Sequence, residues 1–252
     1  MYGFRDLADK TKRYYKYSVD ELKGLIISIL VLAFIVSFKE WGYGDNFNAI
    51  VGLKNLFIAI ILITITILIH DGAQRISALH SGFRIEYKMW WYGLLIGLIL
   101  VFISKGNIWF LAPGGILFHH MATHRLGFFR YGVNIRSVGL ITLIGPIANI
   151  IFATLIKVSQ VNLHLFSVDN IILNKIFLIN WVFAVWNLLP IPPLDGVKVF
   201  QFSRLTYVAL FGFIAGYVAL IKFLGVYSYI IALAVAAVVW FAYYIGFERK
   251  VI

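Results

Sequence analysis

Long apolar runs recur along the whole chain, separated by short segments that carry lysine and arginine. Six runs have the length of a membrane span or nearly so: 22–38, 53–69, 137–158, 171–189, 205–224 and 226–246. About 20 apolar residues cross the hydrocarbon core as a helix, and a helix satisfies its own backbone hydrogen bonds there. The sequence therefore predicts an all-α polytopic membrane protein with about six transmembrane helices.

Composition supports this class and excludes others. Hydrophobic residues make up 62% of the 252 residues and charged residues 13%, against about 45–50% and about 25% in soluble domains. A soluble enzyme, a disordered chain and a fibre are therefore excluded. There is no cysteine, which excludes disulfides and cysteine-ligated zinc. The net charge of +11 comes from residues between the apolar runs, so we expect a lipid bilayer as partner and no nucleic acid.

The segment 90–118 is too irregular for an ordinary span. Its apolar part, 90–103, has fourteen residues and is followed by a stretch that holds Pro113, Gly114 and Gly115, which disfavour a continuous helix. We therefore expect a re-entrant or extended excursion near 90–118 rather than a full crossing. With the N-terminus inside, this topology places 17 of the 22 lysines and arginines on the inner side, as the positive-inside rule requires. It predicts a multi-pass protein of the cell membrane with cytosolic N- and C-termini.

This topology suggests four parts. They are a cytosolic basic arm (1–21), a first transmembrane helix with an outer loop (22–52), a membrane core (53–200) and a C-terminal pair of transmembrane helices (201–252). We expect Arg75 and Arg84, near the inner ends of their segments, to extend toward the headgroups.

Two polar clusters interrupt the apolar core. His70 and Asp71 close the second span, and Asp195 follows the span that begins near Ile171. Both spans run from outside to inside in the predicted topology, so the clusters end at the same depth. Because ionisable groups in a membrane are costly, an imidazole and a carboxylate at matching depth indicate a site.

At these residues the chain resembles the site-2-protease family of intramembrane zinc metalloproteases. The similarity covers about 69–200, and its prokaryotic, archaeal-like features are the segments 84–90 and 112–115. The late element from Asn187 to Asp195 and Gly196 is similar to the family's Leu-Asp-Gly motif, whose aspartate binds zinc. The resemblance implies a substrate-groove and core motif at Pro113, Gly114, Gly115, Gly145, Pro146, Asn149, Asn187, Pro190 and Gly196.

The zinc helix of this resemblance is degenerate. His70 matches the first histidine of His-Glu-x-x-His, but Asp71 replaces the glutamate that acts as general base, and Gln74 replaces the second histidine. The implied metal ligands are then His70, Gln74 and Asp195. A neutral amide binds zinc poorly, so two good ligands remain where a catalytic site needs three and a water. The resemblance implies zinc as cofactor if a site survives, and otherwise none.

Other histidines offer a weaker route to a metal. His120 and His124 stand four residues apart and could share a helical face as alternative ligands. No acidic residue accompanies them, so we favour polar residues at the membrane interface.

Three functions compete. The first is a proteolytically impaired relative of the site-2 proteases, a pseudoenzyme that binds or sequesters the transmembrane segment of a client protein. The second is an active intramembrane zinc metalloprotease that cleaves transmembrane substrates with altered ligands. The third is a proton or cation transporter component that uses His70, Asp71 and Asp195 as a relay, although the sequence lacks the internal repeat of such proteins.

Overall fold

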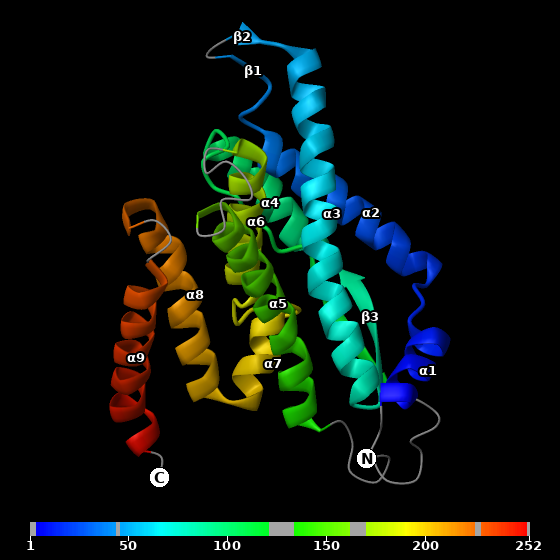
Figure 1. Ribbon diagram of the computed structural model, residues 1–252, viewed down its shortest axis with the longest axis vertical. Coiled ribbons are helices and arrows are strands. Elements are labelled where there is room, and N and C mark those ends of the chain that lie inside the picture. The colour runs from blue at the N-terminus through cyan, green and yellow to red at the C-terminus, as the bar shows by residue number, and fades with distance from the viewer. Residues whose placement is uncertain (1–3, 44–45, 121–133, 162–169, 225–227, 251–252) are drawn as a thin grey trace. The chain divides into compact units, whose positions relative to one another are not determined.

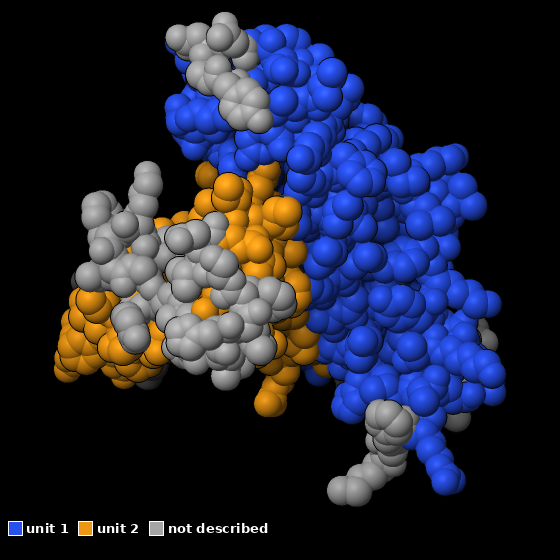
Figure 2. All heavy atoms as spheres, turned by 45° about the horizontal axis from the view of Figure 1, so that its top comes forward, with its two compact units in different colours: residues 1–134 blue, residues 135–252 orange. Residues whose placement is uncertain are grey.

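The computed structural model describes residues 4–43, 46–120, 134–161, 170–224 and 228–250. It is mostly helical, with a few short strands (Figure 1). The chain divides into two compact units, residues 1–134 and 135–252 (Figure 2). Each unit is described by itself.

Four helices form the frame of the first unit. They are α1 (Phe4–Tyr14), α2 (Val19–Ser37), α3 (Ala49–His80) and α4 (Trp91–Ile103). A capping box starts α2: the Ser18 hydroxyl accepts from the Glu21 amide, and the Glu21 carboxylate accepts from the Ser18 amide. At the start of α3 the Asn48 side chain accepts from two backbone amides. Helices α2 and α3 are in contact, and α2 crosses behind the longer α3 in Figure 1.

Two antiparallel strand pairs correct the all-α expectation. The short pair is β1 (Gly42–Tyr43) with β2 (Asn46–Phe47), and the longer pair is β3 (Phe83–Met89) with β4 (Gly114–His120). Buried and less buried side chains alternate along β3 from Phe83 to Tyr87, which is the period of a strand and not of a helix. Hydropathy averaged over a long window hides so short a pattern.

The β3–β4 pair makes the segment between them an excursion that returns to its start. Met89 lies opposite Gly114 in the register, and the Trp90 amide donates to the Pro113 carbonyl at 2.8 Å. Helix α4, which starts the excursion, has 13 residues and is about 20 Å long, short of the roughly 30 Å hydrocarbon core. The chain therefore leaves β3 and returns to it at β4, while a re-entrant path in the membrane stays a prediction.

The second unit is built from helices. They are α5 (Ile135–Val161), α6 (Ile171–Asn187), α7 (Asp195–Phe202), α8 (Arg204–Leu224) and α9 (Ser228–Gly246), followed by a short 3₁₀ turn, η4 (Glu248–Lys250). Its core lies between α6 and α8, where the Trp181 ring stacks on Tyr217 at 3.9 Å between centroids. Phe177, Leu188 and Val199 are buried around this pair.

Each of the six apolar runs lies largely within one helix, as predicted. Three helical stretches are long and apolar enough to cross a membrane: Ala49–His80, Ile135–Gln160 and Ser228–Gly246. This is consistent with a membrane protein. The number of six spans and the four-part division remain predictions.

Candidate functional site

Helix α3 continues beyond the apolar run 53–69 and includes the first polar cluster. It continues through His70, Asp71 and Gln74 to His80, and these three side chains are buried. Glycine at position 72 allows a close approach, because a Cβ there would lie 3.3 Å from the Tyr15 hydroxyl. Because α3 is continuous here, His70 and Gln74 stand one helical turn apart. This is the spacing of the two histidines in a zinc helix.

Asp71, to which the resemblance assigns the position of a general base, is held by two donors. Arg75, the next residue on the same face, donates from Nε to Asp71 Oδ2 at 2.5 Å. The Tyr17 hydroxyl, from the segment between α1 and α2, donates to the same oxygen at 2.8 Å. Oδ1 of Asp71 is buried and accepts no hydrogen bond from the described residues.

Arg75 joins this carboxylate to a second one. Its other guanidinium nitrogens donate to the Glu21 carboxylate and to the Ile85 carbonyl. The guanidinium also lies over the Tyr17 ring, 4.0 Å from its centroid. The side chain is only 3% exposed, so the expectation that Arg75 extends to the headgroups is wrong. The sequence indicates this ion pair, because Asp71 and Arg75 are oppositely charged and four residues apart on one helix.

Glu21 is fully engaged and ties the cluster to the sheet. Besides Arg75, it accepts from the Tyr87 amide at 2.7 Å and from the Ser18 amide at 2.9 Å. The Ser18 hydroxyl donates to Glu86, and the other oxygen of Glu86 lies 3.2 Å from His119 Nε2 on β4. The buried ionic cluster thus links α2, α3 and the β3–β4 sheet. We name it the Arg75 cluster: Tyr17, Glu21, Asp71 and Arg75.

Tyr17 stays protonated in this setting. Burial raises the pKa of its phenol above the ordinary value, and the negative charge of Asp71 raises the pKa further. The hydroxyl is therefore a donor at all physiological pH values. It acts as a fixed contact from the N-terminal segment to Asp71.

The Pro113-Gly114-Gly115 segment is buried and closely packed at the start of β4. The Tyr87 hydroxyl lies 3.0 Å from the Pro113 carbonyl, to which it donates, and 2.8 Å from the Ser28 hydroxyl. A Cβ at position 114 would lie 2.3 Å from the Lys88 carbonyl oxygen, so only glycine fits there. These residues position the strand.

The implied residues of the second unit are mostly buried too. Asp195 is the first residue of α7 and is 3% exposed. A Cβ on Gly196 would lie 2.0 Å from the Leu188 carbonyl oxygen, so this glycine lets α7 fold against the end of α6. Asn187 donates to the Phe183 carbonyl one turn earlier, and Pro190 is exposed. On α5, three residues are buried: Gly145, Pro146 and Asn149.

Lys198, one turn after Asp195, is a cation beside this position. Its ammonium donates to the Pro193 carbonyl at 3.3 Å. Burial lowers the pKa of Lys198, and the negative charge of Asp195 partly offsets this effect.

The donor set does not fit a catalytic zinc centre. Within the described ranges there is no group of three or more histidine, aspartate or glutamate side chains that could hold a metal. On α3, Gln74 supplies a neutral amide in place of an imidazole. His120 is the last residue of strand β4 rather than part of a helix, and His124 lies outside the described residues. Their role as ligands remains a prediction.

The fold defines a mostly helical protein with apolar helices of spanning length. No protein-family model and no solved structure matches the chain. A protein of Methanocaldococcus jannaschii named "Putative zinc metalloprotease" is 28% identical over 189 residues, which cover 75% of this chain and 87% of the relative. The chain is thus similar to a zinc metalloprotease over most of both lengths.

Proposed function

We propose that this protein is a membrane-embedded relative of the site-2 proteases that does not hydrolyse peptide bonds and instead binds transmembrane segments of client proteins. The observation that carries the proposal is the Arg75–Asp71 ion pair at the position of the general base. The similarity to a named zinc metalloprotease supports the relationship. The Arg75 cluster supports the loss of activity.

A general base must accept a proton from the attacking water within hydrogen-bond reach. Two donors already occupy Oδ2 of Asp71, and one of them is a permanently charged guanidinium. Protonating this carboxylate would break a buried ion pair, which is strongly unfavourable because it leaves Arg75 with less compensation. A structural role for Asp71 follows.

The metal position is weakened independently. Zinc in catalytic sites takes three protein ligands, usually imidazole or carboxylate, and a water. Gln74 stands one turn after His70, where the motif has its second histidine, and supplies a neutral amide in place of the imidazole. In the proposal the protein has no resident zinc.

Strand β4 supports client binding. It is seven residues long and pairs with β3 along one edge, and among the described residues no third strand pairs with the other edge. Leu117, near the middle of β4, is 47% exposed. An extended client segment could add to such an edge by backbone hydrogen bonds.

The proposal includes the topology predicted above. The protein crosses the cell membrane six times, with cytosolic termini and a re-entrant segment near 90–118. The ionic cluster and Asp195 then lie toward the inner side.

One observation favours a second function, that of an active zinc metalloprotease. Oδ1 of Asp71 is buried and has no hydrogen-bond partner in the described part of the chain. A water held at this oxygen would give Asp71 the role of a base. Nothing comparable favours a proton or cation relay, because Asp71 is already paired with Arg75.

Zinc content and cleavage separate these two functions. Three proteins would be purified in detergent: the wild type, a double variant (Asp71→Glu and Gln74→His) and a triple variant that adds Arg75→Leu. Bound zinc would be measured by elemental analysis. We expect no zinc in wild type, and zinc in both restored variants. We expect cleavage of a transmembrane peptide only in the triple variant, because Arg75 still holds the carboxylate in the double one. Since the loss of Arg75 also destabilises the buried cluster, thermal unfolding of each variant would give the folded fraction to which its cleavage rate is referred. About one zinc per wild-type chain, lost in His70→Ala together with peptide cleavage, would establish the active protease instead.

Client binding has its own test. A photoreactive amino acid would replace Leu117 on β4, and Tyr92 on α4, which is 72% exposed, would serve as the control position. The probes are two transmembrane peptides in vesicles, one all leucine and alanine and one with a central Gly-Pro pair that unwinds its helix. Cross-linking of the second peptide at 117 and not at 92 is expected. Equal cross-linking at both positions, or to both peptides, would contradict strand addition.

A further inference from the structure

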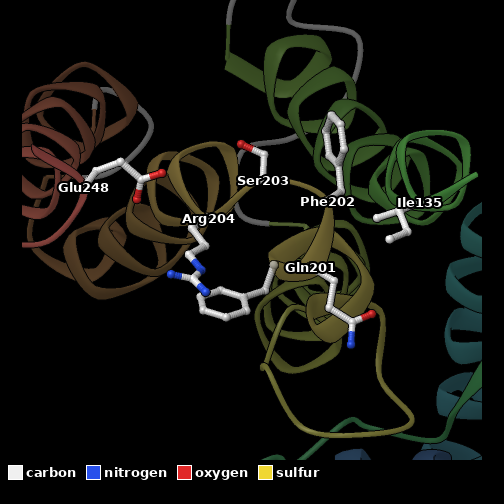
Figure 3. Close-up of a pocket in the computed structure, with 7 residues that line it drawn as sticks. Ile135, Gln201, Phe202, Ser203, Arg204 and Glu248 are labelled. Atoms are coloured by element: carbon white, nitrogen blue, oxygen red, sulfur yellow. The ribbon is translucent and has the colours of Figure 1, made fainter. Parts of the chain in front are cut away.

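A polar cavity lies in the second unit. It has a volume of about 720 Å³ and is lined by residues from α5, α7, α8 and η4. Figure 3 shows Arg204, at the start of α8, and Glu248, in η4 after α9, among the side chains that line this space, together with Ser203. The lining of the cavity therefore holds one cation and one anion.

The two charged side chains are not paired with each other. Within the described part of the chain neither makes a hydrogen bond or an ion pair, and the recorded contact of Arg204 is with the Phe200 ring, 5.8 Å from its centroid. The N-terminus of the 21-residue helix α8 adds positive potential beside Arg204. Both charges are thus available to a ligand.

An apolar groove continues from this cavity. It has a volume of about 820 Å³, lies between α8 and α9, and shares Ser203 with the polar cavity. Its walls are Leu205, Ala209 and Phe213 on α8 and Leu233, Ala236 and Trp240 on α9. From Leu205 to Phe213 the helix rises about 12 Å, which is close to half of the roughly 30 Å hydrocarbon core.

We infer that the cavity and the groove together bind one phospholipid of the inner leaflet whose headgroup carries a phosphate and a primary ammonium. Arg204 and the start of α8 bind the phosphate. Glu248 accepts hydrogen bonds from the ammonium, and one hydrocarbon chain lies in the α8–α9 groove. In the proposed topology this end of α8 and α9 faces the inner side. The inference is independent of whether the protein is a protease.

The charges distinguish this lipid from other membrane lipids. Phosphatidylcholine has a quaternary ammonium that cannot donate a hydrogen bond to Glu248. Phosphatidylglycerol has a phosphate but no cation for Glu248 at all. We therefore expect phosphatidylethanolamine to bind best of the three.

Native mass spectrometry of the full chain, titrated with each of these three lipids, tests the inference. Arg204→Ala should weaken all three by about tenfold, and Glu248→Gln should remove only the preference for phosphatidylethanolamine. Arg249→Ala changes a neighbouring cation that does not line the cavity, so it should leave the titration unchanged. Ala209→Trp should fill the groove and lower binding without altering the order of the lipids. Thermal unfolding of each variant in detergent checks that it is folded.

Three results would overturn the inference. One is equal affinity of the wild type for phosphatidylglycerol and phosphatidylethanolamine. Another is a loss in Arg249→Ala as large as that in Arg204→Ala. The third is that a transmembrane peptide displaces the bound lipid and binds Arg204→Ala and Glu248→Gln as tightly as the wild type. The groove would then be a helix-docking surface instead.

Discussion

Arg75 Nε lies 2.5 Å from Asp71 Oδ2, one helical turn away on α3, and the same guanidinium reaches Glu21 on α2. Two buried carboxylates therefore share one cation. The cluster connects helices α2 and α3 with strand β3.

Arg75→Met should destabilise the protein strongly. It removes the only guanidinium from a cluster with two buried carboxylates, and breaking a buried pair in this way costs about 3–5 kcal/mol. The free energy of unfolding, measured by chemical denaturation in detergent, should fall by that amount. Lys23→Met is the control, because Lys23 pairs with Asp20 at 3.7 Å on the surface and should change stability by less than about 0.5 kcal/mol. Similar effects of the two substitutions would argue against a structural ionic cluster.

Stability should also depend on the protonation of Tyr17. Its pKa is raised in the folded state by burial and by the charge of Asp71, so the folded protein favours the neutral phenol. This contribution is fully present below the unfolded pKa of about 10 and is lost as the pH rises toward the higher folded value. The difference in unfolding free energy between wild type and Tyr17→Phe should therefore shrink above about pH 10. A difference that grows with pH would mean that tyrosinate, not tyrosine, is the favoured form.

Removal of metal should leave the wild type unchanged. A ligand that binds only the folded state raises the unfolding temperature by mass action, and we propose no resident zinc. Dialysis against a chelator, followed by thermal unfolding with and without added zinc, should give one and the same midpoint. A zinc-dependent rise that His70→Ala abolishes would instead point to a surviving metal site.

Gly196→Ala should disturb the packing of α7 against the end of α6. The added Cβ would lie 2.0 Å from the Leu188 carbonyl oxygen and 2.5 Å from that of Leu189, so the backbone must shift, at a cost of about 1–3 kcal/mol. Gly246→Ala is a matched control at the end of α9, where nothing lies within 4 Å of the new atom. Hydrogen exchange of the α7 amides should rise in the first variant and not in the second. Unchanged exchange in both would show that α7 tolerates the contact.

The sequence by itself determined where the long apolar helices lie. Each apolar run appears as a helix because a segment with no polar partner for its backbone must satisfy its own hydrogen bonds. The break near Pro113 and Gly114 was also readable, since these residues end helices. The buried positions of His70, Asp71 and Asp195 agree with their placement in apolar segments.

Tertiary structure alone decided what these polar residues contact. Arg75 was expected among the headgroups, yet it is buried, because Asp71 and Glu21 supply the charges that make burial tolerable. Glu21 and Tyr17 are more than 50 residues away from their partners in the sequence. The β3–β4 pairing likewise joins segments across an intervening helix. Periodicity and spacing report on neighbours along the chain, whereas these contacts arise only when distant segments fold together.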